Sequence, residues 1–98
     1  MLFMVIERYL AGPRAVYERA AVHGRMLPDG LRYVDSWVVD DDCLDRCFQL
    51  METNDPALFD LWLACWQDLV EFEIHPVIDT AAAARRVEVT WRSEPPAT

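Results

Sequence analysis

Short runs of alternating hydrophobic and polar residues, separated by turn-forming residues, predict four β-strands in this chain. The runs cover residues 2–9, 31–39, 46–52 and 70–77 and are rich in β-branched and aromatic side chains. Helices are expected over 14–23 and 56–69, because Gly12-Pro13 and Asp55-Pro56 are typical helix starts. A shorter helix is expected over 81–86, after which 87–91 forms a short strand or continues the helix.

This order of elements predicts an α+β fold of the ferredoxin-like type, β-α-β-β-α-β. In that fold a four-stranded antiparallel sheet carries two helices on one face, and its other face is open. We expect a single domain over residues 1–92. Residues 93–98, which include two prolines, are expected to be a frayed C-terminal tail.

Alternation along each strand predicts which side chains face the helices. The first strand is apolar on both sides, and we place Leu2, Met4 and Ile6 under the helices. The other inward residues are expected to be Val34, Ser36, Val38, Phe48, Leu50, Val70, Phe72 and Ile74. The open face is then expected to carry Phe3, Val5, Glu7, Tyr9, Tyr33, Asp35, Trp37, Cys47, Gln49, Met51, Glu71, Glu73 and His75.

A face that mixes large aromatic and ionisable side chains is typical of an interface or a ligand site. The candidate ligand-binding residues on it are Glu7, Tyr33, Asp35, Trp37, Gln49, Glu73 and His75. Tyr33, Asp35 and Trp37 suit an aromatic pocket with one acidic anchor, or equally a dimer interface. The two interpretations are compatible.

His75 is the candidate catalytic residue, because it lies beside Glu71 and Glu73 on one strand face. With Tyr33 or Glu73 nearby, it would transfer a proton in an oxygenase-like or isomerase-like reaction. The alternative is an ordinary polar residue near the end of a sheet. Arg25 suits an anion bound bidentately, or else a solvated or Asp29-paired side chain. Cys47 is interpreted as a packing residue rather than a nucleophile.

A net charge of −8 excludes the basic surface that nucleic acids and anionic membranes require. All nine basic residues are arginine, so chemistry that needs a lysine is excluded as well. The three cysteines form no zinc motif, and Asp40–Asp42 lacks the ligand spacing of a calcium loop, so no metal and no cofactor are expected. The apolar N-terminus is too short for a signal peptide or a membrane span, and we expect a cytoplasmic protein with reduced cysteines.

Four stretches, MLFMVIE (1–7), GRMLP (24–28), GLRYVDSW (30–37) and RCFQLME (46–52), resemble a small bacterial family of domains of unknown function, DUF3303. With Asp55-Pro56 and residues 66–76, the resemblance covers about residues 1–85, and the tail after Arg86 departs from it. The strand order is similar to that of the dimeric α+β barrel group. The resemblance implies no catalytic residues.

Two functions follow from these observations. In the first, the protein is a homodimeric α+β barrel that binds a small, partly aromatic molecule as a carrier, sensor or enzyme. A second apolar stripe on the helix expected over 56–69, formed by Phe59, Leu63 and Trp66, favours such self-association. In the alternative, it is a structural or protein-interaction module whose open sheet face only packs on a partner.

Overall fold

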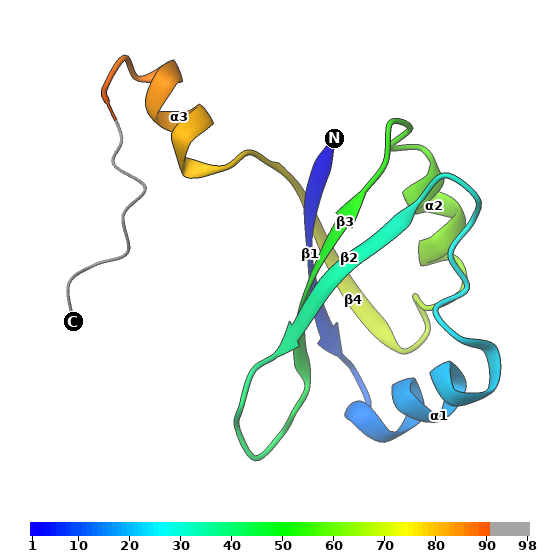
Figure 1. Cartoon of the computed structure of the whole chain (residues 1–98). Coiled ribbons are helices and arrows are strands. Elements are labelled where there is room, and N and C mark those ends of the chain that lie inside the picture. Colours follow the sequence, from blue (N-terminus) through cyan, green and yellow to red (C-terminus); the bar gives the residue numbers. More distant parts are fainter. Residues whose placement is uncertain (91–98) are drawn as a thin grey trace.

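The computed structural model describes residues 1–90 and confirms the predicted ferredoxin-like α+β fold (Figure 1). Its elements are β1 (Leu2–Tyr9), α1 (Pro13–His23), β2 (Arg32–Val38), β3 (Arg46–Glu52), α2 (Leu58–Leu63), β4 (Val70–Val77) and α3 (Thr80–Arg86). The strands form one sheet in the order β2-β3-β1-β4, and all neighbours are antiparallel. The expected tail over 93–98 lies outside the described residues.

The second helix is shorter than the predicted range of 56–69. Regular α-helix is confined to Leu58–Leu63, and the chain then continues in tighter turns to Leu69. In these turns the backbone N–H of Trp66 donates to the carbonyl of Leu63, and that of Leu69 donates to the carbonyl of Trp66. Trp66 follows Trp62 by four residues, and both indoles are buried.

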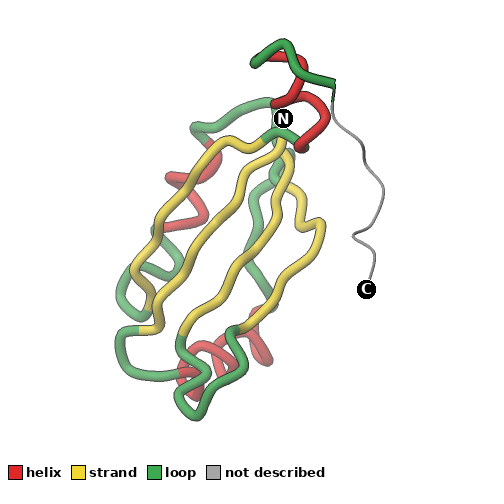
Figure 2. The backbone as a smooth tube through the Cα atoms, turned by 90° about the vertical axis from the view of Figure 1, so that its left-hand side faces the viewer, coloured by secondary structure: helices red, strands yellow, loops and turns green. Residues whose placement is uncertain are grey.

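Helices α1 and α2 cover the same face of the sheet, and the core lies between them and the strands (Figures 1 and 2). The phenyl rings of Phe3 on β1 and Phe59 on α2 pack edge to face, with centroids 5.1 Å apart. Trp62 packs in the same way on Phe72 of β4, at 5.2 Å. Helix α1 contributes the buried Val16. The inward residues of β4 are therefore those predicted.

The predicted facing of β1 and β3 is wrong. Alternate residues from Phe3 to Tyr9 on β1 and from Cys47 to Met51 on β3 are buried under the helices, whereas Leu2, Met4, Ile6, Phe48 and Leu50 face the open side. The physical reason is that a hydrogen bond from Gln49 to Glu7 lowers the cost of burying these two polar side chains, so that they can lie in the interior.

A β-bulge in β2 explains a third difference. Pairing with β3 shifts between Tyr33 and Asp35, so that Val34 is inserted without a partner. Tyr33 therefore shares the helix side with its neighbour Met51 instead of the open face. Beyond the bulge the alternation is as predicted, with Ser36 and Val38 inward and Asp35 and Trp37 on the open face.

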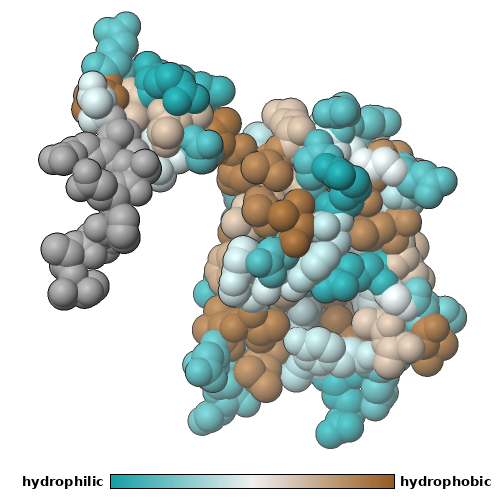
Figure 3. Space-filling view, viewed as in Figure 1, coloured by the Kyte–Doolittle hydropathy of each residue, from teal (hydrophilic) through white to brown (hydrophobic). Residues whose placement is uncertain are grey.

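The open face carries a different apolar set from the predicted one, because Leu2, Met4 and Ile6 of β1 lie on it, followed by Arg8. Hydrophobic patches run along the side of the body that faces away from α1 and α2, interrupted by polar side chains (Figure 3). The apolar residues of this open face are Leu2, Met4, Ile6, Trp37, Phe48 and Leu50. Arg8–Glu71 and His75–Glu73 pairs, with N···O distances of 2.7 and 2.8 Å, lie along its β4 side.

Helix α3 stands away from the rest of the molecule, beyond the N-terminal end of β1 and on the side of the open face (Figures 1 and 2). Asp79 caps it by accepting a hydrogen bond from the backbone N–H of Ala82 at 2.7 Å. The hydrogen bonds of the described residues 79–89 all remain within that segment. A helix of seven residues is too short to be stable on its own in water.

Candidate functional site

A cavity of about 310 Å³ lies on the helix side of the sheet, between the strands and α1. All four strands, α1, the loop after it and the two buried tryptophans contribute to its wall. The lining residues are Glu7, Tyr9, Val16, Tyr17, Ala20, Gly24, Arg25, Ser36, Val38, Cys47, Gln49, Trp62, Trp66 and Val70. Its volume is at the lower end of the range for small-molecule sites.

A buried carboxyl–amide pair forms the inner wall. Glu7 and Gln49 are only 4% and 8% exposed, and Gln49 Nε2 donates to Glu7 Oε2 at 2.7 Å. Gln49 Oε1 is buried without a hydrogen-bond partner among the described residues. Burial raises the pKa of Glu7 to about 7, although the hydrogen bond from Gln49 opposes this rise. Near neutral pH the carboxyl can therefore accept or give up a proton.

Tyr9 and Cys47 lie beside this pair and are also buried. Burial raises the pKa of the Cys47 thiol to about 11 and raises the pKa of the Tyr9 hydroxyl as well. Both groups are therefore protonated at neutral pH. The surroundings of Cys47 disfavour the thiolate that a nucleophile needs, which supports its interpretation as a packing residue.

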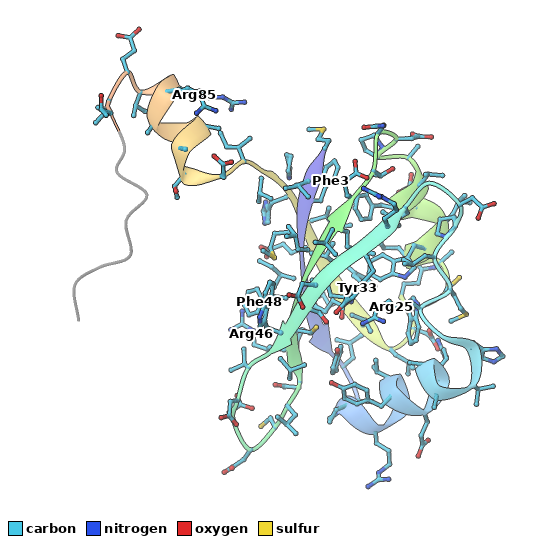
Figure 4. All side chains as sticks on the ribbon, viewed as in Figure 1. Phe3, Arg25, Tyr33, Arg46, Phe48 and Arg85 are labelled. Atoms are coloured by element: carbon cyan, nitrogen blue, oxygen red, sulfur yellow. The ribbon has the colours of Figure 1, made fainter. Side chains whose placement is uncertain are left out.

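Arg25 occupies the rim of the cavity. Its guanidinium carbon lies 3.6 Å from the centroid of the Tyr33 ring, and Figure 4 shows the two side chains together on the helix side of β2. The Tyr33 hydroxyl is in turn 2.7 Å from Ser36 Oγ. The indole N–H groups of Trp62 and Trp66 both donate to the backbone carbonyl of Arg25, at 3.0 Å each. Arg25 forms no ion pair with any described carboxylate.

The sheet separates the predicted ligand-binding residues into two groups. Glu7 and Gln49 line the cavity, and Tyr33 supports Arg25 at its rim. On the opposite face of the sheet lie Asp35, Trp37, Glu73 and His75. The His75 imidazole is hydrogen-bonded to Glu73 at 2.8 Å, as its sequence position suggested, but Tyr33 lies on the other side of the sheet.

Sequence reasoning did not select the cavity residues Tyr9, Ser36, Trp62 and Trp66. One signal in the sequence points to the cavity face. In β3 the set formed by Arg46, Phe48, Leu50 and Glu52 contains two formal charges, whereas the alternate set from Cys47 to Met51 contains none. Since charges are costly to bury, the uncharged set is the better candidate for the interior.

The acidic loop between β2 and β3 brings Asp41, Cys43 and Asp45 together, with potential ligand atoms within 4.8 Å of one another. Asp41 Oδ1 already accepts hydrogen bonds from the backbone N–H groups of Cys43 and Leu44, at 3.0 and 2.9 Å. Asp41 therefore stabilises the loop through these two hydrogen bonds. The three cysteines are unpaired.

Comparison with known proteins identifies a family to which the chain is similar. The model of a family described as a domain of unknown function, DUF3303, matches residues 1–91, and thus extends past Arg86, where the resemblance was expected to end. Neither the curated proteins nor the solved structures contain a match to the chain. Among the described residues, none of the helices has the length and apolar character needed to cross a membrane.

Proposed function

The chain belongs to the DUF3303 family, and from this premise we propose that it is a small-molecule-binding domain whose ligand occupies the cavity beneath α1. The observation that carries the proposal is the buried Glu7–Gln49 pair in the cavity wall. Burying a carboxyl costs folding free energy that an apolar residue would not. Groups of this kind, placed in a cavity with a shifted pKa, are characteristic of functional sites.

The size and lining of the cavity favour a compact, partly aromatic ligand. Tyr9, Tyr17 and the two buried indoles supply aromatic wall, while Val16 and Val70 supply aliphatic wall. Polar groups are few and occupy the inner wall and the rim. This combination of apolar walls with a small number of fixed polar groups is typical of ligand pockets.

A thermal-shift screen tests this proposal. Aromatic acids, polyketide-like compounds and neutral aromatic alcohols are suitable probes. A compound present at 100 times its Kd stabilises the native state by about 2.7 kcal/mol, which for a domain of this size raises the melting temperature by roughly 10 °C or more. We expect Ala20→Phe, which fills the cavity from α1, to abolish the shift.

Ala21→Phe is the matched control, because the adjacent Ala21 is exposed and does not line the cavity. It should retain the ligand-induced shift. Equal shifts in the two variants would place the ligand elsewhere and contradict the proposal. A screen without any shift would favour the alternative, a protein-interaction module.

We further propose that the chain is a homodimer in which the open faces of two copies pack together, as in a dimeric α+β barrel. Support comes from the six apolar residues that the open face leaves partly or fully exposed on both central strands and on β2. Contiguous apolar surface of this kind favours an interface.

The unpaired cysteines support the expected cytoplasmic location, where thiols remain reduced.

Helix α3 supports a second copy of the chain as the occupant of the open face. It projects on that side without packing on its own sheet, and it ends in Arg85 and Arg86 although the chain as a whole is acidic. Glu71 and Glu73 lie exposed on the open side of β4, where Glu71 also pairs with Arg8 and Glu73 with His75. A partner with the same acidic row would offer the arginines complementary charge and the helix a surface to pack on.

Leu50→Glu tests the dimer. Leu50 lies on the open face of the central strand β3, so a carboxylate there would be desolvated in the interface. We expect the dimer dissociation constant to rise by about a hundredfold. Size-exclusion chromatography with light scattering over a concentration series measures it.

Leu61→Glu makes the same substitution on the exposed side of α2 and should leave the dimer intact. If the unmodified protein has the mass of one 11.4 kDa chain at tens of micromolar, the dimer is excluded. Equal dissociation of the two variants would show that the interface is not the open face.

A further inference from the structure

The rim of the cavity holds a cation that is fixed in position and free to bind an anion. Stacking on Tyr33 fixes the plane of the Arg25 guanidinium, and the two indole N–H groups fix its backbone. An arginine held in this way loses little conformational entropy when it binds a carboxylate bidentately. The chain has a net charge of −8, and yet Arg25 at the rim of the cavity pairs with no described carboxylate. Its charge is therefore available to an anionic ligand.

The inner wall of the cavity requires a different group. Glu7 offers carboxylate oxygens, and Gln49 has a carbonyl oxygen that no described donor satisfies. The ionised Glu7 carboxylate and the Gln49 carbonyl oxygen are acceptors, and a buried acceptor without a donor, such as Gln49 Oε1, is costly. A ligand that reaches this wall is therefore favoured if it carries an O–H or N–H group.

Aromatic side chains connect the two ends. Tyr9, Tyr17, Trp62 and Trp66 line the same cavity as Arg25 and the Glu7–Gln49 pair. A flat ring between these faces gains edge or stacking contacts in addition to the burial of its area. The cavity volume of about 310 Å³ suits one substituted ring rather than a fused polycycle.

Together these features define a class of ligand. We propose that the cavity binds a hydroxylated or amino-substituted aromatic acid, with its carboxylate on Arg25 and its O–H or N–H group donating to the Glu7–Gln49 pair. This inference rests on the proposed small-molecule function and specifies its ligand.

Isothermal titration calorimetry with three related compounds tests each end separately. 4-Hydroxybenzoate has both groups, benzoate lacks the donor, and 4-hydroxybenzyl alcohol lacks the charge. We expect the unmodified protein to bind 4-hydroxybenzoate about tenfold more tightly than either of the others, because a charge-assisted hydrogen bond has about that effect.

Two substitutions test which residue binds each end of the ligand. Arg25→Gln should weaken the binding of 4-hydroxybenzoate and benzoate about tenfold and leave that of the alcohol within twofold. Glu7→Met should weaken 4-hydroxybenzoate and the alcohol by a similar factor but leave benzoate unchanged. Arg14→Gln is the matched control, since the Arg14 side chain is 88% exposed on α1 and does not line the cavity. Gln49→Met serves as a second test of the inner wall if Glu7→Met does not fold.

Failure of the ligand class can be distinguished from failure of the function. If Arg25→Gln weakens all three compounds equally, or leaves 4-hydroxybenzoate unchanged, the carboxylate does not bind at the rim and the proposal is overturned. If only the alcohol binds and Ala20→Phe abolishes that binding, the cavity is a ligand site but not one for acids. If none of the three compounds binds, this ligand class is excluded, and the thermal-shift screen decides the function independently.

Discussion

Glu7→Gln is expected to stabilise the protein by about 3 kcal/mol at pH 8 and to have little effect at pH 4. The variant keeps the size of the side chain and an oxygen that can accept the hydrogen bond from Gln49. It removes only the ability to ionise. The difference between the two proteins should therefore depend on pH and follow the titration of a single carboxyl.

The sign follows from the pKa of Glu7 in the two states. Burial raises it from 4.5 to about 7 in the folded protein, so the folded state holds a proton that the unfolded state has already released between these values. The contribution of protonated Glu7 to the free energy of unfolding is fully present below pH 4.5. It declines as the pH rises and is lost somewhat above pH 7. The difference between a pKa of 4.5 and one of about 7 corresponds to about 3 kcal/mol.

Urea denaturation of both proteins at pH 4, 6 and 8 measures this effect. Glu18→Gln is the control, because Glu18 lies on the solvent side of α1, where its side chain is 70% exposed. Its free energy of unfolding should be close to that of the unmodified protein at each pH. Parallel curves for Glu7→Gln and the unmodified protein would mean that Glu7 titrates normally, and the argument that the cavity contains a costly functional carboxyl would fail.

Trp62→Ala should lower the free energy of unfolding by about 4 kcal/mol, a large part of the total stability of a domain of this size. Trp62 is 2% exposed and packs on Phe72 and Phe59. Its removal leaves a void beside the existing cavity. The hydrogen bond it loses matters less, because Trp66 still donates to the same carbonyl of Arg25.

Leu61→Ala is the comparison for this prediction. Leu61 precedes Trp62 on α2 but is 60% exposed, so the substitution should change stability by less than about 0.5 kcal/mol. Trp62→Phe separates packing from hydrogen bonding, since it keeps an aromatic ring without the N–H group, and we expect it to retain most of the stability. A loss below about 1 kcal/mol in Trp62→Ala would show that the indole does not fill the core.

The elements of this fold were predictable because they depend on local chemistry. The bounds of β1, β3 and β4 agree with the hydrophobic runs, and α1 begins at the proline that marks its start. The end of α2 was not predictable in the same way. Residues 64–69 have the spacing of a helix, but they form tighter turns.

The orientation of the strands depended on tertiary contacts. Alternation identifies two sets of side chains in β1 but not which set is buried when both are apolar. Glu7 and Gln49 favoured the wrong prediction, because polar side chains are expected to face solvent. The hydrogen bond between them lowers the cost of burying both. The β2 bulge places Tyr33 on the helix side of the sheet, and alternation along the strand does not predict a bulge.

The candidate site was therefore predicted in part and for incomplete reasons. Glu7, Gln49 and Tyr33 were selected as members of one face and do come together, but on the other side of the sheet from the one expected. Arg25 was interpreted as an anion ligand or as a solvated or Asp29-paired side chain, and in the structure it stacks on Tyr33 and forms no ion pair with Asp29. The contribution of Trp62 and Trp66 depends on the loop after α1, because both indoles donate to the carbonyl of Arg25.

The bulge in β2 has a consequence for aggregation. Strands β2 and β4 are the two edges of the sheet, and a regular edge offers unpaired backbone groups to any other strand. The inserted Val34 disrupts the hydrogen-bonding pattern of one edge, and Pro76 removes an N–H donor from the other. Strand-to-strand growth into fibrils is disfavoured at both edges, so that the protein can expose a hydrophobic sheet face while its edges resist uncontrolled polymerisation.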